Sequence, residues 1–596
     1  MRRYLALWAE MMRVSWRRAP AATAAMITVC ALTIGASAGI ALSLRAVIDG
    51  SAHGALGAAV TAACGAALCN GVSITFQQTM WDLFQRLTDE TGLELRARIQ
   101  RWITGIESLD HLERTDLLDR SEAARNSAWQ ISMSLWQMVM AARSGLQLGV
   151  TLLILGIVNP WLLILLPFAA LPLWFDHRGK QAVVATETAT AEVFRLQRHL
   201  FRLGTQADSG KEIRVAGASH EIARRQAAAW DEAALLRYRA RVRAAVWKFG
   251  GWAVFASGFV GALALVAHQA ARGRGTAGDV AMAVIVASGL RQTVQQVVGR
   301  TASTLGTRTA IESYLWLREY AAAEKTRTVK ASPTPIRLAE GITFEHVSYR
   351  YPGTDRLALY DVSVHIPAGT VLAIVGEYGS GKTTLVKLLA KFSSPESGRI
   401  TVDGSDLTDL DTVDWRSHVS AAFQDFGRLE TSFAEGVGLG DLPRLTDRER
   451  ISRAVRDADA TALVERLPQG LDTELGRELG GVDLSEGQWQ RVALARALMR
   501  SNPVLFVLDE PTASLDAPSE HAIFERQMDR ARRLAARNGA ITVIVSHRFS
   551  TVTSADLILV LDRGRLVESG THTELAALPG GRYADLYGLQ RAAYRA

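Results

Sequence analysis

The strongest candidate for chemistry in this sequence is a glycine-rich loop that ends in lysine and threonine. The loop has the spacing G-x-x-x-x-G-K-T and consists of Gly376, Glu377, Tyr378, Gly379, Ser380, Gly381, Lys382, Thr383 and Thr384. It follows the β-branched run 371–375 and precedes a helical stretch, 385–389. Backbone N–H groups of such a loop wrap phosphate oxygens, and the next helix adds the positive end of its dipole. The strand–loop–helix context therefore predicts a site for ATP, with Lys382 reaching the β- and γ-phosphates and Thr383 binding Mg²⁺.

A pair of carboxylates is the second candidate for chemistry. The apolar run 504–508 ends in Asp509 and Glu510. An acidic residue at the end of a buried strand is where phosphate-loop ATPases hold Mg²⁺, so Asp509 fits that role. Glu510 is then the natural general base for the attacking water. The alternative is a solvated pair of carboxylates at a strand end.

Short β-branched runs are expected to position these residues. The runs 371–375, 505–508 and 542–545 are typical of buried parallel strands, and helical patterns separate them. Residues 341–596 are therefore expected to form an α/β nucleotide-binding domain. A polar stretch with Ser332-Pro333-Thr334-Pro335 precedes it, so residues 322–340 are interpreted as a linker.

The N-terminal half of the chain is expected to cross a membrane. Mean hydropathy is +0.08, which is high for a soluble protein, and a spanning helix needs about 20 apolar residues. Six apolar segments fit, at about 21–44, 55–76, 135–158, 161–175, 244–268 and 280–298. The last is the weakest, because Arg291 and several glutamines interrupt it. We therefore predict an all-α six-helix transmembrane domain over 21–321, after an interfacial helix at 1–20.

Charge placement gives the expected topology. Arginine is concentrated in 1–20, 78–130 and 177–243, whereas the turns between the other spans are short and carry few charges. The positive-inside rule then places the N-terminus and both long loops in the cytoplasm. The net charge of +7 is explained by this pattern, and no basic stripe with stacking aromatics indicates nucleic acid. Polar breaks at 108–120 and 205–218 are expected to form short cross-helices at the loop tips.

A third motif gives the sequence a specific resemblance. Ser485, Glu486, Gly487 and Gln488 follow Leu484 and precede the helical stretch 489–498, which closely resembles the L-S-G-G-Q signature of ABC ATPases. The order of phosphate loop, Gln424, signature, Asp509-Glu510, Ser514-Leu515-Asp516 and His547 is similar to that family throughout. The membrane half resembles the exporter-type (type IV) arrangement of half-transporters.

The resemblance implies roles for further residues. Tyr351 would stack on adenine, Gln424 would contact Mg²⁺, and His547 would bond the γ-phosphate. Asp516 would act across a dimer interface, and Ser485 to Gln488 would close on the ATP of a second subunit. A second half-transporter, identical or different, is therefore the implied partner. Residues 211–217 resemble the loop whose coupling helix docks on the partner ATPase, and 110–120 would be the first coupling helix.

One signature position departs from the family pattern. Glu486 stands where the family usually has glycine. A carboxylate directed at a γ-phosphate would repel it and weaken the site. Alternatively, Glu486 points to solvent and stabilises the N-terminus of its helix, which is the interpretation we favour.

These features predict an ATPase-coupled exporter of an amphipathic substrate in the plasma (inner) membrane of a bacterium. The substrate would be a peptide, a lipid or a drug-like molecule, and membrane lipid would surround the spans. An ATP-gated regulator without transport, or an exporter-shaped importer, remains as an alternative. Arg291 either faces the substrate or lies where its helix leaves the bilayer, and the sequence leaves both open.

Overall fold

The computed structural model describes residues 2–272, 276–327, 332–477, 480–510, 517–546 and 549–593. The chain forms two compact units, each of which collects two stretches of sequence. The helical unit contains residues 1–100 and 123–315, and the ATPase unit contains residues 101–122 and 316–596. The first long loop predicted from the sequence is thus divided, because its tip belongs to the ATPase unit.

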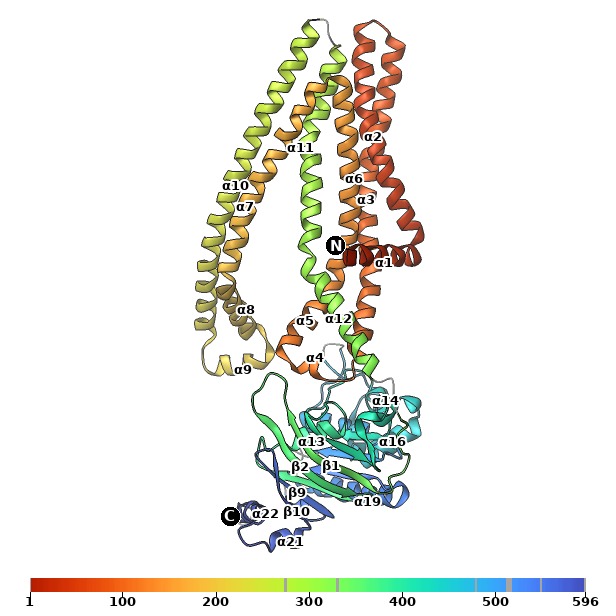
Figure 1. The fold of residues 1–596 in the computed structure, drawn as a ribbon, viewed down its shortest axis with the longest axis vertical. Coiled ribbons are helices and arrows are strands. Elements are labelled where there is room, and N and C mark those ends of the chain that lie inside the picture. The colour runs from red at the N-terminus through yellow and green to blue at the C-terminus, as the bar shows by residue number, and fades with distance from the viewer. Residues whose placement is uncertain are drawn as a thin grey trace. The chain divides into compact units, whose positions relative to one another are not determined.

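Long helices make up the helical unit (Figure 1). A first helix, α1 (Arg2–Arg18), covers the segment predicted to be interfacial. Figure 1 shows α7 and α10 side by side along most of their length. The long helices that follow α1 are α2 (Pro20–Ala52), α3 (Leu56–Thr104), α6 (Ser127–Val158), α7 (Leu165–Ala189), α10 (Ser219–Ala271) and α11 (Ala277–Gly306).

Five helical segments among the described residues are long and apolar enough to cross a membrane. They are Pro20–Ala52, Leu56–Thr104, Ser127–Val158, Pro160–Ala189 and Ser219–Ala271. The helix α11 exists where the sixth span was predicted and is long enough, but it is not among the helices apolar enough to cross a membrane. Arg291 and the glutamines of α11 lower its hydropathy, so a count of six spans stays a prediction.

A proline turn joins two of these helices where the sequence predicted it. Asn159 ends α6 with an extended backbone, and its Oδ1 accepts a hydrogen bond of 3.0 Å from the backbone N–H of Trp161. Pro160 then begins a 3-10 turn (η1, Pro160–Ile164) that leads into α7. Proline suits this position, because the N–H groups of the first helical residues have no hydrogen-bond acceptor within the helix.

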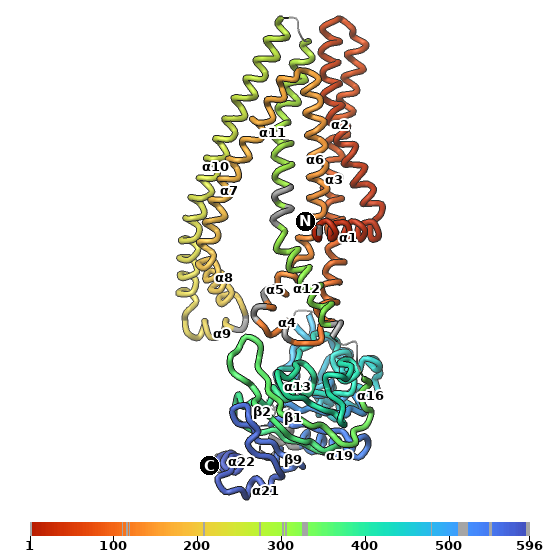
Figure 2. The backbone as a smooth tube through the Cα atoms, viewed as in Figure 1, coloured from red at the N-terminus to blue at the C-terminus, as the bar shows by residue number. Residues whose placement is uncertain are grey.

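Short helices lie at both predicted loop tips. The chain passes from α3 through α4 (Asp110–Glu113) and α5 (Thr115–Arg125) into α6, as Figure 2 shows. The second tip is formed by α8 (Ala191–Thr205) and α9 (Ala207–Val215). The predicted cross-helices are therefore confirmed. The helix α12 (Arg308–Arg327) continues into the stretch interpreted as a linker, so the first residues of that stretch are helical.

Two sheets form the framework of the ATPase unit, which confirms the predicted α/β fold. A six-stranded sheet has the order β10-β9-β3-β8-β7-β6, and its strands β3, β6, β7, β8 and β9 run parallel. Its strands are β3 (Val371–Gly376), β6 (Val419–Ala422), β7 (Leu505–Asp509), β8 (Ile541–Val545), β9 (Leu557–Asp562) and β10 (Arg565–Gly570). A four-stranded antiparallel sheet contains β1 (Gly341–Arg350), β2 (Leu357–Pro367), β4 (Ser397–Val402) and β5 (Ser405–Asp406).

Helices cover both faces of the six-stranded sheet. The helices of this unit that follow β3 are α13 (Lys382–Leu389), α14 (Thr412–Ser417), α15 (Phe433–Gly438), α16 (Arg448–Asp457), α17 (Thr461–Arg466), α18 (Glu486–Ala497), α19 (Ala517–Asn538), α20 (Phe549–Val552), α21 (His572–Ala576) and α22 (Arg582–Ala593). Alternate residues of β7 enter two different cores, because successive side chains of a strand point to opposite faces. Phe506 packs in the core that contains Trp489 of α18, and Val507 in the core that contains Leu385 of α13. One strand thus fixes the signature helix and the phosphate-loop helix on opposite faces.

Candidate nucleotide site

The phosphate loop lies between β3 and α13, as the sequence predicted. Its backbone requires glycine at the turn, since φ is +107° at Gly381 and +152° at Gly376. A Cβ on Gly381 would also lie 2.8 Å from Cδ2 of Leu359. The glycines therefore allow both the left-handed backbone and the close packing that bring successive N–H groups to one concave surface.

The Lys382 side chain folds back over the loop. Its Nζ donates hydrogen bonds of 2.9 Å to the carbonyl oxygens of Gly376 and Glu377. Burial lowers the pKa of Lys382, and the nearby carboxylates of Glu510 and Asp509 act in the opposite direction. The structure thus brings Lys382 into electrostatic contact with the carboxylate pair, although Lys382 lies far from that pair in the sequence.

Asp509 is a buried carboxylate, and one of its oxygens has no hydrogen-bond partner among the described residues. Its side chain ends β7 with 2% exposure, and no described residue forms a hydrogen bond with Oδ1. Burial raises the pKa of Asp509 to about 6, helped by the negative charges of Glu510 and Asp425 and opposed by Lys382. An orphaned buried carboxylate at this position fits a divalent cation, because hard cations prefer oxygen ligands.

Two further candidate ligands for a cation lie near the same edge of the sheet. Thr383 is exposed in the first turn of α13, and Gln424 is exposed just beyond the end of β6. The strands β6 and β7 pair in parallel up to Ala422 and Leu508, so Gln424 and Asp509 follow adjacent strand ends. No group of three or more His, Cys, Asp or Glu side chains suited to a metal occurs among the described residues. These ligands suit an Mg²⁺ ion that is bound jointly by the protein and by phosphate oxygens. They suit a metal ion bound by protein groups alone less well.

Glu510 has a strained backbone that neighbouring elements hold in place. Its φ is +48°, a left-handed value that is uncommon for a residue other than glycine. The Glu510 N–H donates to the carbonyl of Val545 at 3.0 Å, and Gln490 Nε2 donates to the carbonyl of Glu510 at 3.1 Å. The sequence analysis missed Gln490. A buried glutamine within the signature helix α18 was the available signal.

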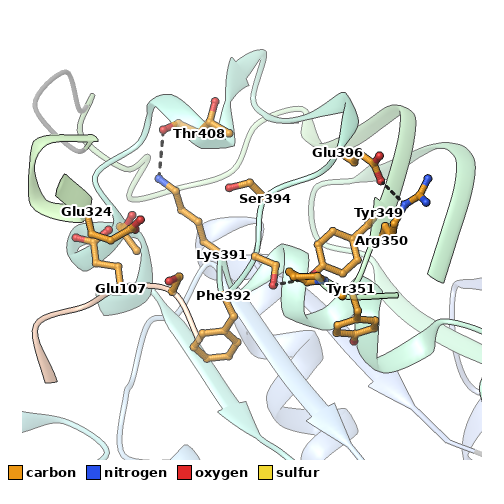
Figure 3. A pocket seen from close by; sticks show the side chains of 15 residues that line it. Glu107, Glu324, Tyr349, Arg350, Tyr351, Lys391, Phe392, Ser394, Glu396 and Thr408 are labelled. Carbon is orange, nitrogen blue, oxygen red and sulfur yellow. Dashed lines mark hydrogen bonds and ion pairs between the residues drawn. The ribbon is translucent and has the colours of Figure 1, made fainter. Parts of the chain in front are cut away.

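Tyr351 borders a cavity of about 620 Å³ next to α13 (Figure 3). Its hydroxyl forms a hydrogen bond of 3.0 Å with Oγ1 of Thr384, and Lys387 Nζ lies 5.4 Å from the ring centroid. The Tyr349 ring meets Tyr351 edge-on at 5.1 Å, and the Tyr349 hydroxyl donates to Ser393 at 3.1 Å. Tyr349 therefore packs against Tyr351, while adenine stacking on Tyr351 stays a prediction.

The tip of the first long loop contacts the phosphate-loop helix directly. Lys387 Nζ of α13 forms an ion pair of 2.7 Å with Oε1 of Glu113 in α4. Arg416 Nη2 donates to the backbone carbonyl of Glu107 at 2.8 Å. The sequence identified the loop tip but not these partners, because the contacts join residues about 300 positions apart.

The signature motif begins helix α18, as predicted. Ser485 is the N-cap residue and forms a capping box with Gln488: Ser485 N–H donates to Gln488 Oε1 at 2.8 Å, and Gln488 N–H donates to Ser485 Oγ at 3.4 Å. Glu486 is half exposed, which agrees with the favoured interpretation, but it does not point freely into solvent. Its carboxylate forms an ion pair with Arg428, a residue that the sequence analysis did not consider.

Two predicted site residues lie outside the described residues. These are His547 and Asp516, the latter together with the rest of 511–516. Their expected roles at the γ-phosphate and at the dimer interface stay predictions.

Comparison with known proteins indicates what the chain is similar to. Residues 359–513, which include the phosphate loop, the signature and Glu510, match the family model described as "ABC transporter". This part of the chain is therefore similar to that family. The fold of the whole chain resembles the solved "Structure of a bacterial Atm1-family ABC exporter with ATP bound", with a TM-score of 0.74, 96% of this chain and 98% of that chain covered, and 23% identity. The two proteins therefore share a fold.

Curated relatives include proteins named "ATP-dependent lipid A-core flippase". The protein of Pseudomonas aeruginosa is 38% identical over 319 residues, which cover 53% of this chain and 50% of the relative. The protein of Xanthomonas campestris pv. campestris is 35% identical over 407 residues, which cover 66% of this chain and 64% of the relative. The chain thus matches between about half and two thirds of the length of these relatives.

Proposed function

We propose that this chain is the ATP-hydrolysing subunit of a bacterial exporter that moves an amphipathic, lipid-like substrate by alternating access. One observation carries the proposal: Lys382, the orphaned Asp509 and the strained Glu510 meet at one sheet edge in a chain with at least five membrane-length apolar helices. The flippase names of the relatives support a lipid substrate.

Hydrolysis would use the geometry around β7. Lys382 binds the β- and γ-phosphates, for which its ammonium is already held at the loop. Glu510 accepts the proton of the attacking water as general base. The hydrogen bond to its backbone fixes the position from which its side chain extends. Mg²⁺, when bound by Asp509, Thr383 and Gln424, would neutralise charge on the phosphate oxygens.

Two chains are needed for a complete site. The phosphate loop and the signature of one ATPase unit lie on α13 and α18, which cover opposite faces of the same sheet. The signature Ser485–Gln488 would therefore meet the ATP of a second half-transporter rather than its own. Asp516 and His547 are assigned to the same interface and to the γ-phosphate, respectively. The partner is a second copy or a related chain.

Coupling would start at α13. The helix begins at Lys382, and its Lys387 holds Glu113 of the first loop tip. A rigid-body change that follows ATP binding thus reaches this loop through this ion pair and through the hydrogen bond from Arg416 to the Glu107 carbonyl. The second tip, α9, would dock on the ATPase of the partner chain.

A cavity in the helical unit suits an amphipathic substrate. It has a volume of about 480 Å³ and is formed by α3, α6 and α11. Its wall combines the aromatic side chains of Trp81 and Phe84 with polar side chains such as Gln137 and Arg300. Rings and a cation in one cavity fit a molecule with an apolar part and an anionic group.

Arg291 is better explained by packing than by substrate binding. Its guanidinium lies 3.9 Å from the ring centroid of Trp252 in α10, and Nη1 donates to Gln295 at 3.2 Å. A cation over an aromatic face is a stabilising contact in its own right. We therefore assign Arg291 to the contact between α10 and α11.

The location that fits this function is the bacterial inner membrane, crossed several times. Under the positive-inside rule the N-terminus, the two long loops and the ATPase unit are cytoplasmic.

Reconstitution into liposomes tests the proposal. The purified chain should hydrolyse ATP and transfer a fluorescent anionic lipid between leaflets only when ATP is present. ATP hydrolysis without lipid transfer would favour the regulator, and transfer toward the ATPase side would favour an importer. Either result would contradict the proposed export.

A further inference from the structure

Glu486, which stands where the signature usually has glycine, is paired with the positive charge of Arg428. Glu486 occupies the first turn of α18, and its carboxylate pairs with the guanidinium of Arg428. The two side chains are 53% and 55% exposed, respectively. Among the described residues, Glu486 is the sole hydrogen-bond or ion-pair partner of Arg428. The pair therefore lies at the surface that the signature presents, and both charges are free to respond to a ligand.

The position of Arg428 is fixed by the signature helix itself. Arg428 lies in the loop between β6 and α15, directly after Gly427. Arg496 of α18 donates to the carbonyl oxygens of Gly436 at 2.7 Å and Gly427 at 3.3 Å. Because these bonds join the middle of the loop and the helix α15 that follows it to α18, Arg428 is held opposite Glu486.

A lone carboxylate at this helix end would compete with phosphate. The N-terminus of a helix attracts anions, so Glu486 and a γ-phosphate favour the same location. Two anions at one helix end repel, and the repulsion grows when a closing interface removes water between them. The capping box already uses Ser485 and Gln488, which leaves little freedom to move the first turn aside.

We propose that Arg428 is a positioning residue of the signature: it neutralises Glu486 and holds its carboxylate away from the phosphate-facing side of α18. The γ-phosphate of a partner chain then meets a neutral ion pair. The proposal rests on the proposed function in one respect, namely that two chains enclose ATP between phosphate loop and signature. On this view Glu486 does not mark an impaired ATP site. It is tolerated because of Arg428.

A double-mutant cycle on the full-length chain tests this inference. We expect Arg428→Ala to raise the ATP concentration for half-maximal hydrolysis about tenfold with little change in kcat, since it exposes an unpaired carboxylate to the phosphate. Adding Glu486→Gly should return that concentration to within about twofold of the wild type, because the repulsive charge is gone. Arg428→Lys should retain most of the wild-type behaviour.

A matched control separates this effect from the general loss of a surface ion pair. Arg448 and Asp472 form an equally exposed pair in the same unit, with 57% and 59% exposure. Arg448→Ala should leave the ATP dependence unchanged, because exposed ion pairs contribute little.

Two results would overturn the inference. One is an Arg428→Ala variant that behaves like Arg448→Ala. The other is a double variant that is as impaired as Arg428→Ala alone, which would mean that Arg428 acts on the fold or on phosphate directly. The test can be repeated without hydrolysis in the Glu510→Gln background. There, energy transfer between labels on the two chains measures their ATP-dependent closure. Absence of closure in the parent protein would overturn both the inference and the ATP sandwich, whereas normal closure without lipid transport would contradict the proposed function alone.

Discussion

The ATPase unit and the helical unit hold their functional polar groups in different ways. In the ATPase unit, Asp509 is 2% exposed and Glu510 is clamped through its backbone to β8 and α18. In the helical unit, Arg300 and several glutamines line an open cavity together with aromatic rings. Phosphate chemistry needs a few groups at fixed positions, while an amphipathic molecule can be held by many weak contacts.

This difference predicts how the two units respond to mutation. Removal of one group from a fixed constellation should abolish a step, because no neighbour can replace it. Removal of one contact from a distributed surface should reduce affinity moderately. Substitutions at Glu510, Lys382, Asp509 and Arg300 separate these two responses.

The largest effect is expected at Glu510. Glu510→Gln should lower ATP turnover at least about 100-fold and leave ATP binding intact, because it removes the general base but keeps the shape of the side chain. Steady-state hydrolysis and nucleotide binding by the purified variant give the measurement. Wild-type turnover in this variant would show that Glu510 is not the base.

Lys382→Ala should produce the next largest effect. The loss of its ammonium removes the cation nearest the carboxylate pair and the phosphate loop, so ATP affinity should fall at least about tenfold. Binding of a fluorescent ATP analogue measures this. Lys387→Ala is the informative comparison, because Lys387 lies on the same helix but pairs with Glu113. It should retain ATP binding and lose coupling between substrate and hydrolysis.

Asp509 should make the nucleotide-free protein sensitive to pH. Burial raises the pKa of Asp509 to about 6 from an ordinary value of 3.8, so the folded state binds its proton more tightly than the unfolded state. The associated stability is fully present below about pH 4 and is lost as pH rises through about 6, by up to about 3 kcal/mol.

Thermal unfolding of the wild type and Asp509→Asn, without nucleotide or Mg²⁺, checks this prediction. The Tm difference in favour of the variant should widen between pH 5 and pH 7.5. A constant difference over this range would mean that the carboxylate of Asp509 does not titrate there.

The smallest effect is expected in the helical unit. Arg300→Ala should reduce the apparent affinity for an anionic amphipathic substrate by roughly two- to fivefold, because the other cavity residues remain. Basal ATP hydrolysis should not change. Arg224→Ala, which removes an exposed pair with Glu221 on α10, is the control. A loss of basal hydrolysis in Arg300→Ala as large as that of Glu510→Gln would break the contrast between the two units.

Local patterns predicted the catalytic framework well. The strands β3, β7 and β8, the phosphate loop and the start of α18 all follow from short runs of residues whose local preferences agree with the fold. The contacts of Gln490, Lys387 and Arg428 could not be predicted in this way. Each joins segments that are distant in sequence, and only the folded chain brings them together.

The membrane part was harder to predict from the sequence, for a different reason. Hydropathy identifies segments but carries no information about which side chains face a cavity. The helix α11 shows the limit, because Arg291, which packs on Trp252, and its partner Gln295 also lower the hydropathy of this helix. A polar helix in a bundle and a helix outside the membrane look alike in composition.

ATP-driven lipid transfer is the activity on which the proposed function depends. The wild-type chain and Glu510→Gln should be reconstituted in parallel into liposomes, and the transfer of a fluorescent anionic lipid should be followed after ATP addition. The account predicts continuous transfer by the wild type and none beyond a single turnover by Glu510→Gln. Equal continuous transfer by both proteins, or none by a wild type that hydrolyses ATP, would contradict it.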